Sequence, residues 1–335
     1  MKITINGPVS TELMAQINLA KGQKAMTMEE AAQGWYTWKR KYGSRFGHSN
    51  YLIYVQKWLL EVGDKPVHKV DEDDIDKFVN QTGVKRSTRT FKLSVMRSFY
   101  KYLSARGLVN GDPSKLVRVD FNTLTHVEKE SKAITIFYDH EFDQLLAFLD
   151  RNIIKAMEDT ENPHYTEKVI RHKFEIMDRL TFWKHAVILG RCTGLRFGDI
   201  CQLEWASFGS KFAVWTDKRN TRVEPHIWNP ELFHGTFDRL AATKPRLPLP
   251  AGEYLTKWGQ YCFPEIRDLY LNTFKRSKLP QQFKDLVRRA GLPEHTFHGL
   301  RHTYATDCAG LNIPTPHIAA SLGHQSLQMT KHYIH

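Results

Sequence analysis

The chain has 335 residues, of which 41% are hydrophobic and 25% are charged, and 48 Lys and Arg outnumber 36 Asp and Glu to give a net charge of +12. This length suggests about two domains that each bury a core, and the composition excludes a disordered tail protein, a collagen-like chain and a small disulfide scaffold. A pI near 9.4 on a folded chain indicates a polyanionic partner, with nucleic acid favoured over an anionic membrane surface.

The charge is unevenly divided along the chain. Residues 1–132 carry 22 basic and 14 acidic residues, a net charge of +8, whereas residues 133–335 carry 26 and 22, a net charge of +4. Residues 77–118 include ten basic residues and a single acidic residue, Asp112. Because solvated faces usually mix the two signs, this segment is predicted to contact nucleic-acid phosphates.

After an N-terminal extension of residues 1–24, residues 25–115 are predicted to form a small all-helical domain. Apolar residues recur at helical spacing over 51–62, and the turn residues at 63–66 end that helix. The acidic run 71–74 stands where a helix N-terminus favours anions.

The next predicted helix is capped by Ser87 or Thr88 and carries an apolar stripe over 91–103. Basic side chains lie on another face of this helix, and we expect them to contact DNA: Lys85, Arg86, Arg89, Lys92 and Arg97. A merely solvated basic face is the alternative, which the near absence of acidic residues disfavours. A linker is predicted over 116–132.

Residues 133–335 are predicted to form a mixed domain, so that the chain as a whole is mainly α with a small antiparallel β-sheet (an α+β fold). A helix follows a capping Asp139, and two strands at 211–216 and 221–228 flank a polar turn. From Gln281 onward the chain is predicted to be helical again, with breaks at Gly and Pro residues.

Three short clusters in this second part carry candidate reactive side chains: Thr193-Gly-Leu-Arg196-Phe-Gly-Asp199, then His298-Gly-Leu-Arg301-His302, then Leu322-Gly-His324 with Tyr333 nine residues later. Lys218, in the turn between the two predicted strands, is a fourth candidate. An anionic transition state at phosphorus needs fixed cations around its oxygens. The set therefore suits phosphoryl transfer.

Each of these residue types has a part in such a reaction. Arg196 and Arg301 can each bind phosphate oxygens through two donors, and His324 can donate a further hydrogen bond. Tyr333 offers a hydroxyl nucleophile that would link covalently to phosphorus. Lys218 can protonate a leaving oxygen.

Other chemistries have weaker support. His298 and His302 have the i, i+4 spacing of zinc-binding helices, but an arginine and no glutamate stands between them. A metal site is therefore not expected, and His302 is predicted to hydrogen-bond inside the fold. No phosphate-binding loop, dinucleotide fingerprint or serine elbow is present. The four cysteines form no CxxC pair and indicate reduced thiols in a cytoplasmic protein.

The clusters resemble the tyrosine recombinase (phage integrase) family, from about residue 25 to the end. The specific part is His298-Gly-Leu-Arg301-His-Thr-Tyr-Ala305, then Leu322-Gly-His324, then Met329-Thr-Lys-His-Tyr333-Ile-His335, with Thr193-Gly-Leu-Arg196 upstream. The N-terminal helices resemble the family's core-site DNA-binding domain in pattern rather than in motif.

The resemblance implies a mechanism that needs no metal or nucleotide cofactor. Tyr333 would attack the scissile phosphate, form a 3′-phosphotyrosyl link and release a 5′ hydroxyl. Arg196 and Arg301 would stabilise the pentavalent state, His324 would support the phosphate, and His298 would transfer a proton at the nucleophile.

The resemblance also assigns supporting positions. Lys218 would be the general acid, although Lys244 also precedes an apolar run and is the alternative. Asp199 takes the family's acidic support position. Only Ile334 and His335 follow the tyrosine, whereas many members carry a further tail, so we expect the chain either to pack without one or to stop short of it.

The expected partners follow from the same resemblance. Two domains would clamp double-stranded DNA at attachment or core sites, and four protomers would act on two duplexes, with accessory DNA-bending proteins as candidate partners. The expected role is integration or excision of a phage or mobile element in a bacterial cytoplasm. A type IB topoisomerase-like enzyme and a non-cleaving DNA-binding regulator are the alternatives, and the full set of reactive residues argues against the regulator.

Overall fold

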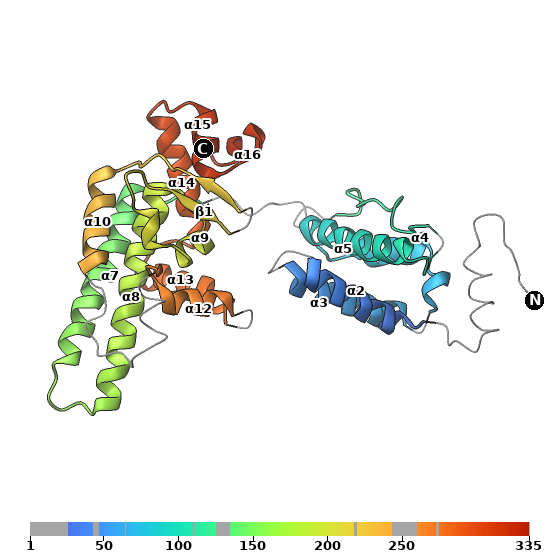
Figure 1. Cartoon of the computed structure of the whole chain (residues 1–335), viewed down its shortest axis with the longest axis horizontal. Coiled ribbons are helices and arrows are strands. Elements are labelled where there is room, and N and C mark those ends of the chain that lie inside the picture. Colours follow the sequence, from blue (N-terminus) through green and yellow to red (C-terminus); the bar gives the residue numbers. More distant parts are fainter. Residues whose placement is uncertain are drawn as a thin grey trace, which may run out of the picture. The chain divides into compact units, whose positions relative to one another are not determined.

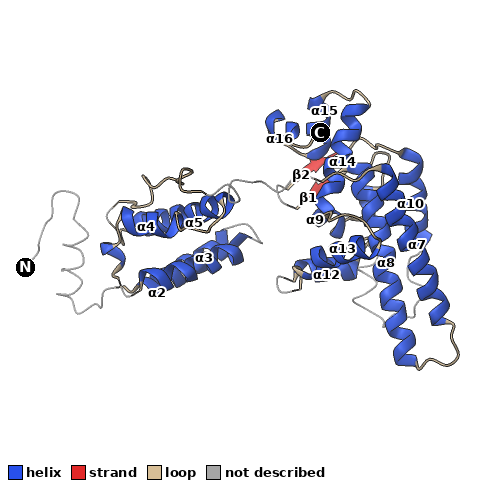
Figure 2. Ribbon diagram, turned by 180° about the vertical axis from the view of Figure 1, so that it is seen from behind, coloured by secondary structure: helices blue, strands red, loops and turns tan. Residues whose placement is uncertain are grey.

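The structure is a computed structural model (Figure 1) that describes residues 26–42, 47–63, 65–109, 111–124, 135–217, 220–242, 260–272 and 275–334. Its contacts divide the chain into two compact units, Met1–Lys132 and Ala133–His335. The described residues are mainly helical with one two-stranded antiparallel sheet, which confirms the predicted fold class (Figure 2). No described helix is both long enough and apolar enough to cross a bilayer.

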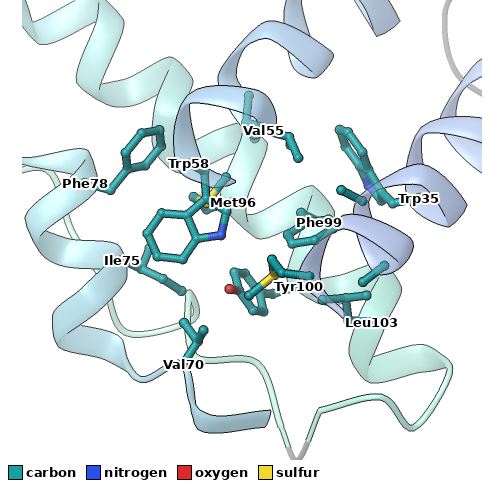
Figure 3. Packing of buried hydrophobic residues seen from close by; sticks show 14 of the residues in the cluster. Trp35, Val55, Trp58, Val70, Ile75, Phe78, Met96, Phe99, Tyr100 and Leu103 are labelled. Carbon is teal, nitrogen blue, oxygen red and sulfur yellow. The ribbon is translucent and has the colours of Figure 1, made fainter. Parts of the chain in front are cut away.

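The first unit is helical throughout its described part. Its elements are α2 (Met28–Tyr42), α3 (Gly47–Val62), the 3-10 helix η1 (Val67–Lys69), α4 (Glu72–Val79) and α5 (Arg86–Ala105). One core joins the four α-helices, because each contributes an aromatic side chain that is at most 1% exposed: Trp35, Trp58, Phe78 and Phe99 (Figure 3). Full burial of one such side chain stabilises a fold by roughly 1.5–3 kcal/mol.

The ends of α3 and α4 follow from local sequence. Gly63 stops α3 because it takes φ 60°, a left-handed conformation that costs glycine little. Asp71 caps α4: its carboxylate accepts a hydrogen bond from the Asp74 amide (3.0 Å), and the Asp74 carboxylate accepts one from the Asp71 amide (3.1 Å). The predicted helix start at 71–74 is confirmed.

The predicted cap of α5 is wrong. The helix begins at Arg86 with Lys85 at the N-cap position, where no side chain caps it. The Lys85 carbonyl already accepts hydrogen bonds from the amides of Thr88 (2.9 Å) and Arg89 (3.0 Å). The hydroxyls of Ser87 and Thr88 therefore fall inside the helix rather than before it.

Two basic side chains of α5 point into the unit. Arg89 is fully buried, and it donates from Nε to the Val84 carbonyl (3.0 Å) and from Nη1 to Thr123 Oγ1 (2.7 Å). Lys92 is 4% exposed and donates to the Phe78 carbonyl (2.7 Å). A buried charge requires such partners. The prediction that Arg89 and Lys92 share an exposed phosphate-binding face is corrected by this burial.

Residues 111–124 pack onto α4 and α5. Asn80 holds them, because its amide nitrogen donates to the Arg118 carbonyl (2.9 Å) and its amide oxygen accepts from the Asp120 amide (2.9 Å). Val117 is buried against the same core. The first half of the segment predicted as a linker over 116–132 is thus part of the helical unit.

The second unit carries the remaining elements. They are α7 (Asp139–Thr160), α8 (Glu167–Thr193), α9 (Phe197–Cys201), the 3-10 helix η2 (Trp205–Ser207), β1 (Val214–Thr216), β2 (Thr221–Val223), α10 (Pro230–Ala242), α12 (Pro264–Leu271), α13 (Lys278–Arg289), α14 (Phe297–Gly310), α15 (Thr315–Leu322) and α16 (Leu327–Lys331). The residue that caps α7 is Tyr138, whose amide donates to Glu141 Oε2 (2.9 Å), so the predicted cap at Asp139 lies one residue too late.

Helix α8 organises this unit, because α7, α10 and α14 all pack against it (Figure 1). The strands β1 and β2 pair antiparallel, with Trp215 opposite Arg222, and they are shorter than the predicted 211–216 and 221–228. The sheet contacts α9 through β1 and α15 through β2. These contacts bring four parts of the unit together around α14: the end of α8, the end of α15, the start of α9 and the hairpin.

Candidate active site

The junction between α8 and α9 is shaped by a glycine. Helix α8 ends at Thr193 because Gly194 takes φ 63° and its amide bonds to the Gly190 carbonyl (3.0 Å). A Cβ atom at position 194 would lie 2.4 Å from the Tyr304 ring and 2.8 Å from Leu322. No other residue fits this position, and the chain turns there so that Arg196 becomes the N-cap of α9.

Arg301 lies at the centre of the site. It is 2% exposed, and it donates from Nη1 to the Gly194 carbonyl (2.7 Å) and from Nη2 to the Leu322 carbonyl (2.6 Å). Burial, followed by the nearby charge of Arg196, lowers the pKa of the Arg301 guanidinium to about 10. Arg301 is therefore still protonated at neutral pH, and the two carbonyls hold its fork in place.

Asp199 connects α9 to the hairpin. Its carboxylate is buried, and Oδ1 accepts a hydrogen bond from the Asp217 amide (2.9 Å), just after β1. Arg196 Nη1 lies 3.9 Å from Asp199 Oδ2. Burial raises the pKa of the Asp199 carboxyl, whereas the Asp217 amide and Arg196 oppose that shift.

Both candidate general acids lie outside the described residues. Lys218 directly follows Asp217, which Asp199 holds, and Lys244 follows α10. The choice of Lys218 over Lys244 as the general acid therefore stays a prediction.

Tyr333 lies within this site. Its hydroxyl is 2.9 Å from His298 Nε2 on α14. The Tyr333 amide bonds to the Thr330 carbonyl (2.8 Å), which forms a turn directly after α16 and directs the side chain towards α14. Helical spacing puts His298, Arg301 and His302 on one face of α14. The predicted nucleophile and the predicted proton acceptor are thus in contact within a single chain.

His324 is oriented by two partners. Gly323 ends α15 with φ 62°, and the two ring nitrogens of His324 then lie 3.0 Å from Arg301 Nη2 and 3.0 Å from Thr330 Oγ1. A guanidinium only donates, so His324 Nε2 accepts from Arg301, and Nδ1–H donates to Thr330. Sequence reasoning missed Thr330, which is fully buried.

His302 packs directly against the candidate nucleophile. Its ring is stacked on that of Tyr333, with centroids 4.1 Å apart and planes 12° apart, and only 7% of the residue is exposed. The rings of His298 and His302 are nearly perpendicular, with centroids 5.1 Å apart and planes 84° apart. The rings of His298, His302 and His324 all lie within 5.4 Å of the Tyr333 ring, centroid to centroid.

The structure therefore gathers in one place most of the predicted catalytic residues (Arg196, His298, Arg301, His324 and Tyr333) and the two predicted supporting residues (Asp199 and His302). A phenol in contact with an imidazole, beside two guanidiniums, is suited to attack on a phosphodiester. Within the described ranges, no three His, Cys, Asp or Glu side chains are placed to hold a metal ion. All four cysteines are buried as free thiols.

Comparisons with known proteins find a family model and relatives that match the chain. The model of the "Phage integrase family" matches residues 164–335, a little more than half of the chain. A "Tyrosine recombinase XerC-like" protein of Caldanaerobacter subterraneus subsp. tengcongensis is 24% identical over 206 residues, which cover 53% of this chain and 49% of that protein. A "Tyrosine recombinase XerC" of Lactobacillus delbrueckii subsp. bulgaricus is 22% identical over 328 residues, covering 92% of this chain and 94% of that protein.

One solved structure extends the likeness to the fold. A crystal structure of a lambda integrase tetramer bound to a Holliday junction has a TM-score of 0.60 and 15% sequence identity. The match covers 97% of this chain and 86% of that chain. The two proteins share a fold over both units.

Proposed function

The chain belongs to the phage integrase family and is a tyrosine recombinase, a DNA breaking and rejoining enzyme, and we propose that Tyr333 is its nucleophile. The observation that carries this proposal is the contact between the Tyr333 hydroxyl and His298 Nε2 (2.9 Å), beside the buried cation of Arg301.

The proposed reaction is a transesterification. The Tyr333 oxygen attacks the scissile phosphorus, and its proton passes to His298. Arg196 and Arg301 bind the non-bridging oxygens, where negative charge grows. The bond from phosphorus to the 5′ oxygen breaks, and Lys218 donates a proton to that oxygen. The enzyme is left on the 3′ phosphate, and the reverse reaction with a 5′ hydroxyl rejoins the strand.

His324 and Asp199 have supporting parts in this proposal. His324 Nε2 accepts a hydrogen bond from Arg301 Nη2 (3.0 Å) and so helps to orient the guanidinium that would bind the phosphate. Asp199 bonds to the Asp217 amide (2.9 Å), which directly precedes Lys218. That bond joins the first turn of α9, which begins directly after Arg196, to the turn that carries the proposed acid.

The general acid is tested with a leaving group that needs no proton. Lys218→Ala is expected to slow cleavage of ordinary DNA by roughly 10²–10⁴-fold, the usual contribution of a general acid. A 5′-bridging phosphorothiolate should restore its rate, because a thiolate leaves unprotonated. Lys244→Ala is the matched control and should cleave both substrates like the wild type. Rescue of Lys244→Ala with no rescue of Lys218→Ala would reverse the assignment.

DNA affinity is proposed to come from the exposed side of α5 and a neighbouring groove. Helix α5 has no acidic residue, and Lys85, Arg86 and Arg97 of the predicted contacts remain exposed. An open groove of about 670 Å³ runs between α5 and residues 112–121, and four basic residues line it: Arg97, Lys101, Lys115 and Arg118. A basic surface with a single acid, Asp112, fits a DNA backbone.

Salt dependence tests this surface. Arg97→Ala and Lys101→Ala are each expected to weaken binding to any duplex and to reduce the slope of log Kobs against log salt by about 0.9. The measurement is a fluorescence-anisotropy titration at several salt concentrations. Lys155→Ala, an exposed lysine on α7, is the control and should leave the slope unchanged. Unchanged slopes in both α5 variants would place the DNA elsewhere.

The biological role that we propose is integration or excision of a phage or mobile element. Residues 25–115 would bind the core site, residues 133–335 would carry out the chemistry, and four copies would join two duplexes. Lambda integrase, whose tetramer is bound to a Holliday junction in a crystal, supports that assembly by its shared fold. The test uses two plasmids that carry DNA flanking the gene. Recombinant plasmids support the role, whereas relaxation of supercoils without recombinants favours the topoisomerase-like alternative.

A further inference from the structure

We infer that one stripe of α14, formed by His298, His302 and Thr306, seats the nucleophile, and that His302 is its main positioning residue. This inference rests on the proposed role of Tyr333. The three residues are spaced i, i+4 and i+8, so they follow one another along a single side of the helix. Together they contact Tyr333 from its hydroxyl to its main chain.

Each member of the stripe holds a different part of Tyr333. His298 Nε2 meets the hydroxyl at 2.9 Å. The ring of His302 covers a face of the phenol ring, with centroids 4.1 Å apart and planes 12° apart. Thr306 Oγ1 donates to the Tyr333 carbonyl at 3.3 Å. Two contacts at the ends of a residue still allow its ring to turn, and the stack of His302 restrains that turn.

His302 is itself held firmly enough to serve as a support. It is 7% exposed, and its ring packs nearly perpendicular to that of His298, with centroids 5.1 Å apart. Because His302 is aromatic and flat, stacking on it favours one orientation of the Tyr333 ring plane. An aliphatic side chain of similar size would not favour one orientation in this way. The stack therefore fixes the direction in which the Tyr333 oxygen lone pairs point. A displacement of about 1 Å at a reacting atom is enough to cost roughly 100-fold in rate.

The test separates an aromatic support from mere bulk. In single-turnover cleavage of a nicked suicide substrate, His302→Leu is expected to form the covalent adduct roughly 10–100-fold more slowly than the wild type. His302→Phe keeps a flat ring and should stay within about threefold of the wild type. DNA affinity should be unchanged in both variants. Equal rates for wild type and His302→Leu, or equal losses for the two variants, would overturn the inference.

A spectroscopic readout is independent of turnover. The ring resonances of Tyr333, identified by their loss in Tyr333→Phe, should show a ring-current shift in the wild type and in His302→Phe. They should move to the position of an unstacked tyrosine in His302→Leu. Resonances that stay in place in His302→Leu would show that the imidazole does not hold the ring.

Should His302→Leu fail to fold, a variant at Thr306 tests the same stripe, because Thr306 contacts the main chain of Tyr333. Thr306→Val removes the donated hydrogen bond at nearly constant shape and is expected to slow adduct formation a few-fold, whereas Thr306→Ser should restore it. Cleavage by Thr306→Val at the wild-type rate would contradict the proposal that this stripe positions Tyr333. The two proposals fail differently. An adduct that persists in Tyr333→Phe would contradict the nucleophile, whereas loss of the adduct in Tyr333→Phe together with a wild-type rate in His302→Leu would contradict the stripe alone.

Discussion

Tyr333→Phe is expected to abolish the covalent adduct between the protein and DNA. Only the hydroxyl oxygen is removed, and the phenyl ring can still stack on His302 and pack beside the cluster around Tyr304 and Leu322. Folding and DNA affinity should therefore be unchanged. Cleavage should fall by roughly 10⁴-fold or more, the scale on which loss of a nucleophile is felt.

The measurement is the amount of covalent adduct formed on a suicide substrate. This substrate has a nick near the scissile phosphate, so that the short strand diffuses away after cleavage and the adduct accumulates. Denaturing gels then separate free protein from protein–DNA adduct. Tyr138→Phe, which changes a tyrosine that is 60% exposed in the same unit, is the matched control and should form adduct normally. An adduct that persists in Tyr333→Phe would assign the nucleophile to another residue.

Arg301→Lys is expected to be nearly as damaging although it conserves charge. The guanidinium spans the carbonyls of Gly194 (2.7 Å) and Leu322 (2.6 Å), and a single ammonium cannot reproduce that fork. A lysine there would also leave carbonyls unsatisfied in a buried place. Because one arginine at a transferring phosphoryl group contributes about 10³–10⁵ in rate, we expect a loss of that order.

Single-turnover cleavage and DNA binding, measured separately, check this prediction. Arg289→Lys, an exposed position on α13, is the control and should cleave normally. The contribution of Arg301 requires its protonated form, so it should be constant below its pKa of about 10 and be lost as the pH rises through that value. Cleavage by Arg301→Lys within tenfold of the wild type would show that charge alone is sufficient.

The contacts among the proposed catalytic residues were largely predictable, because the order of these residues along the chain encodes them. His298 and Arg301 share a helix face by spacing alone, and a glycine before His324 ends the helix that would otherwise carry it away. Thr330 was not predictable. Its bond to His324 depends on the fold of the turn between α15 and α16, and a threonine in such a turn has no distinguishing sequence signal.

The basic helix shows why charge patterns mislead. Arg89 and Lys92 have the spacing of a phosphate-binding face, yet both are buried and donate to carbonyls of their own unit. Nothing near them in sequence indicates that Thr123, 34 residues away from Arg89, supplies a partner. A count of charges predicts the electrostatics of the unit, and only its packing distinguishes the cations that meet solvent from those that hold the fold.

The acceptors that hold Arg301 are main-chain carbonyls, and this has a consequence for how the family can diverge. A carbonyl is present whatever side chain its residue carries, so position 322 can change without loss of its hydrogen bond to Arg301. The carbonyl at position 194 is likewise independent of the side chain. Glycine is nevertheless required there, because φ is 63° and the Tyr304 ring lies too close for a Cβ atom. A substitution near Arg301 is thus compatible with a fixed guanidinium where it leaves these two main-chain acceptors in place.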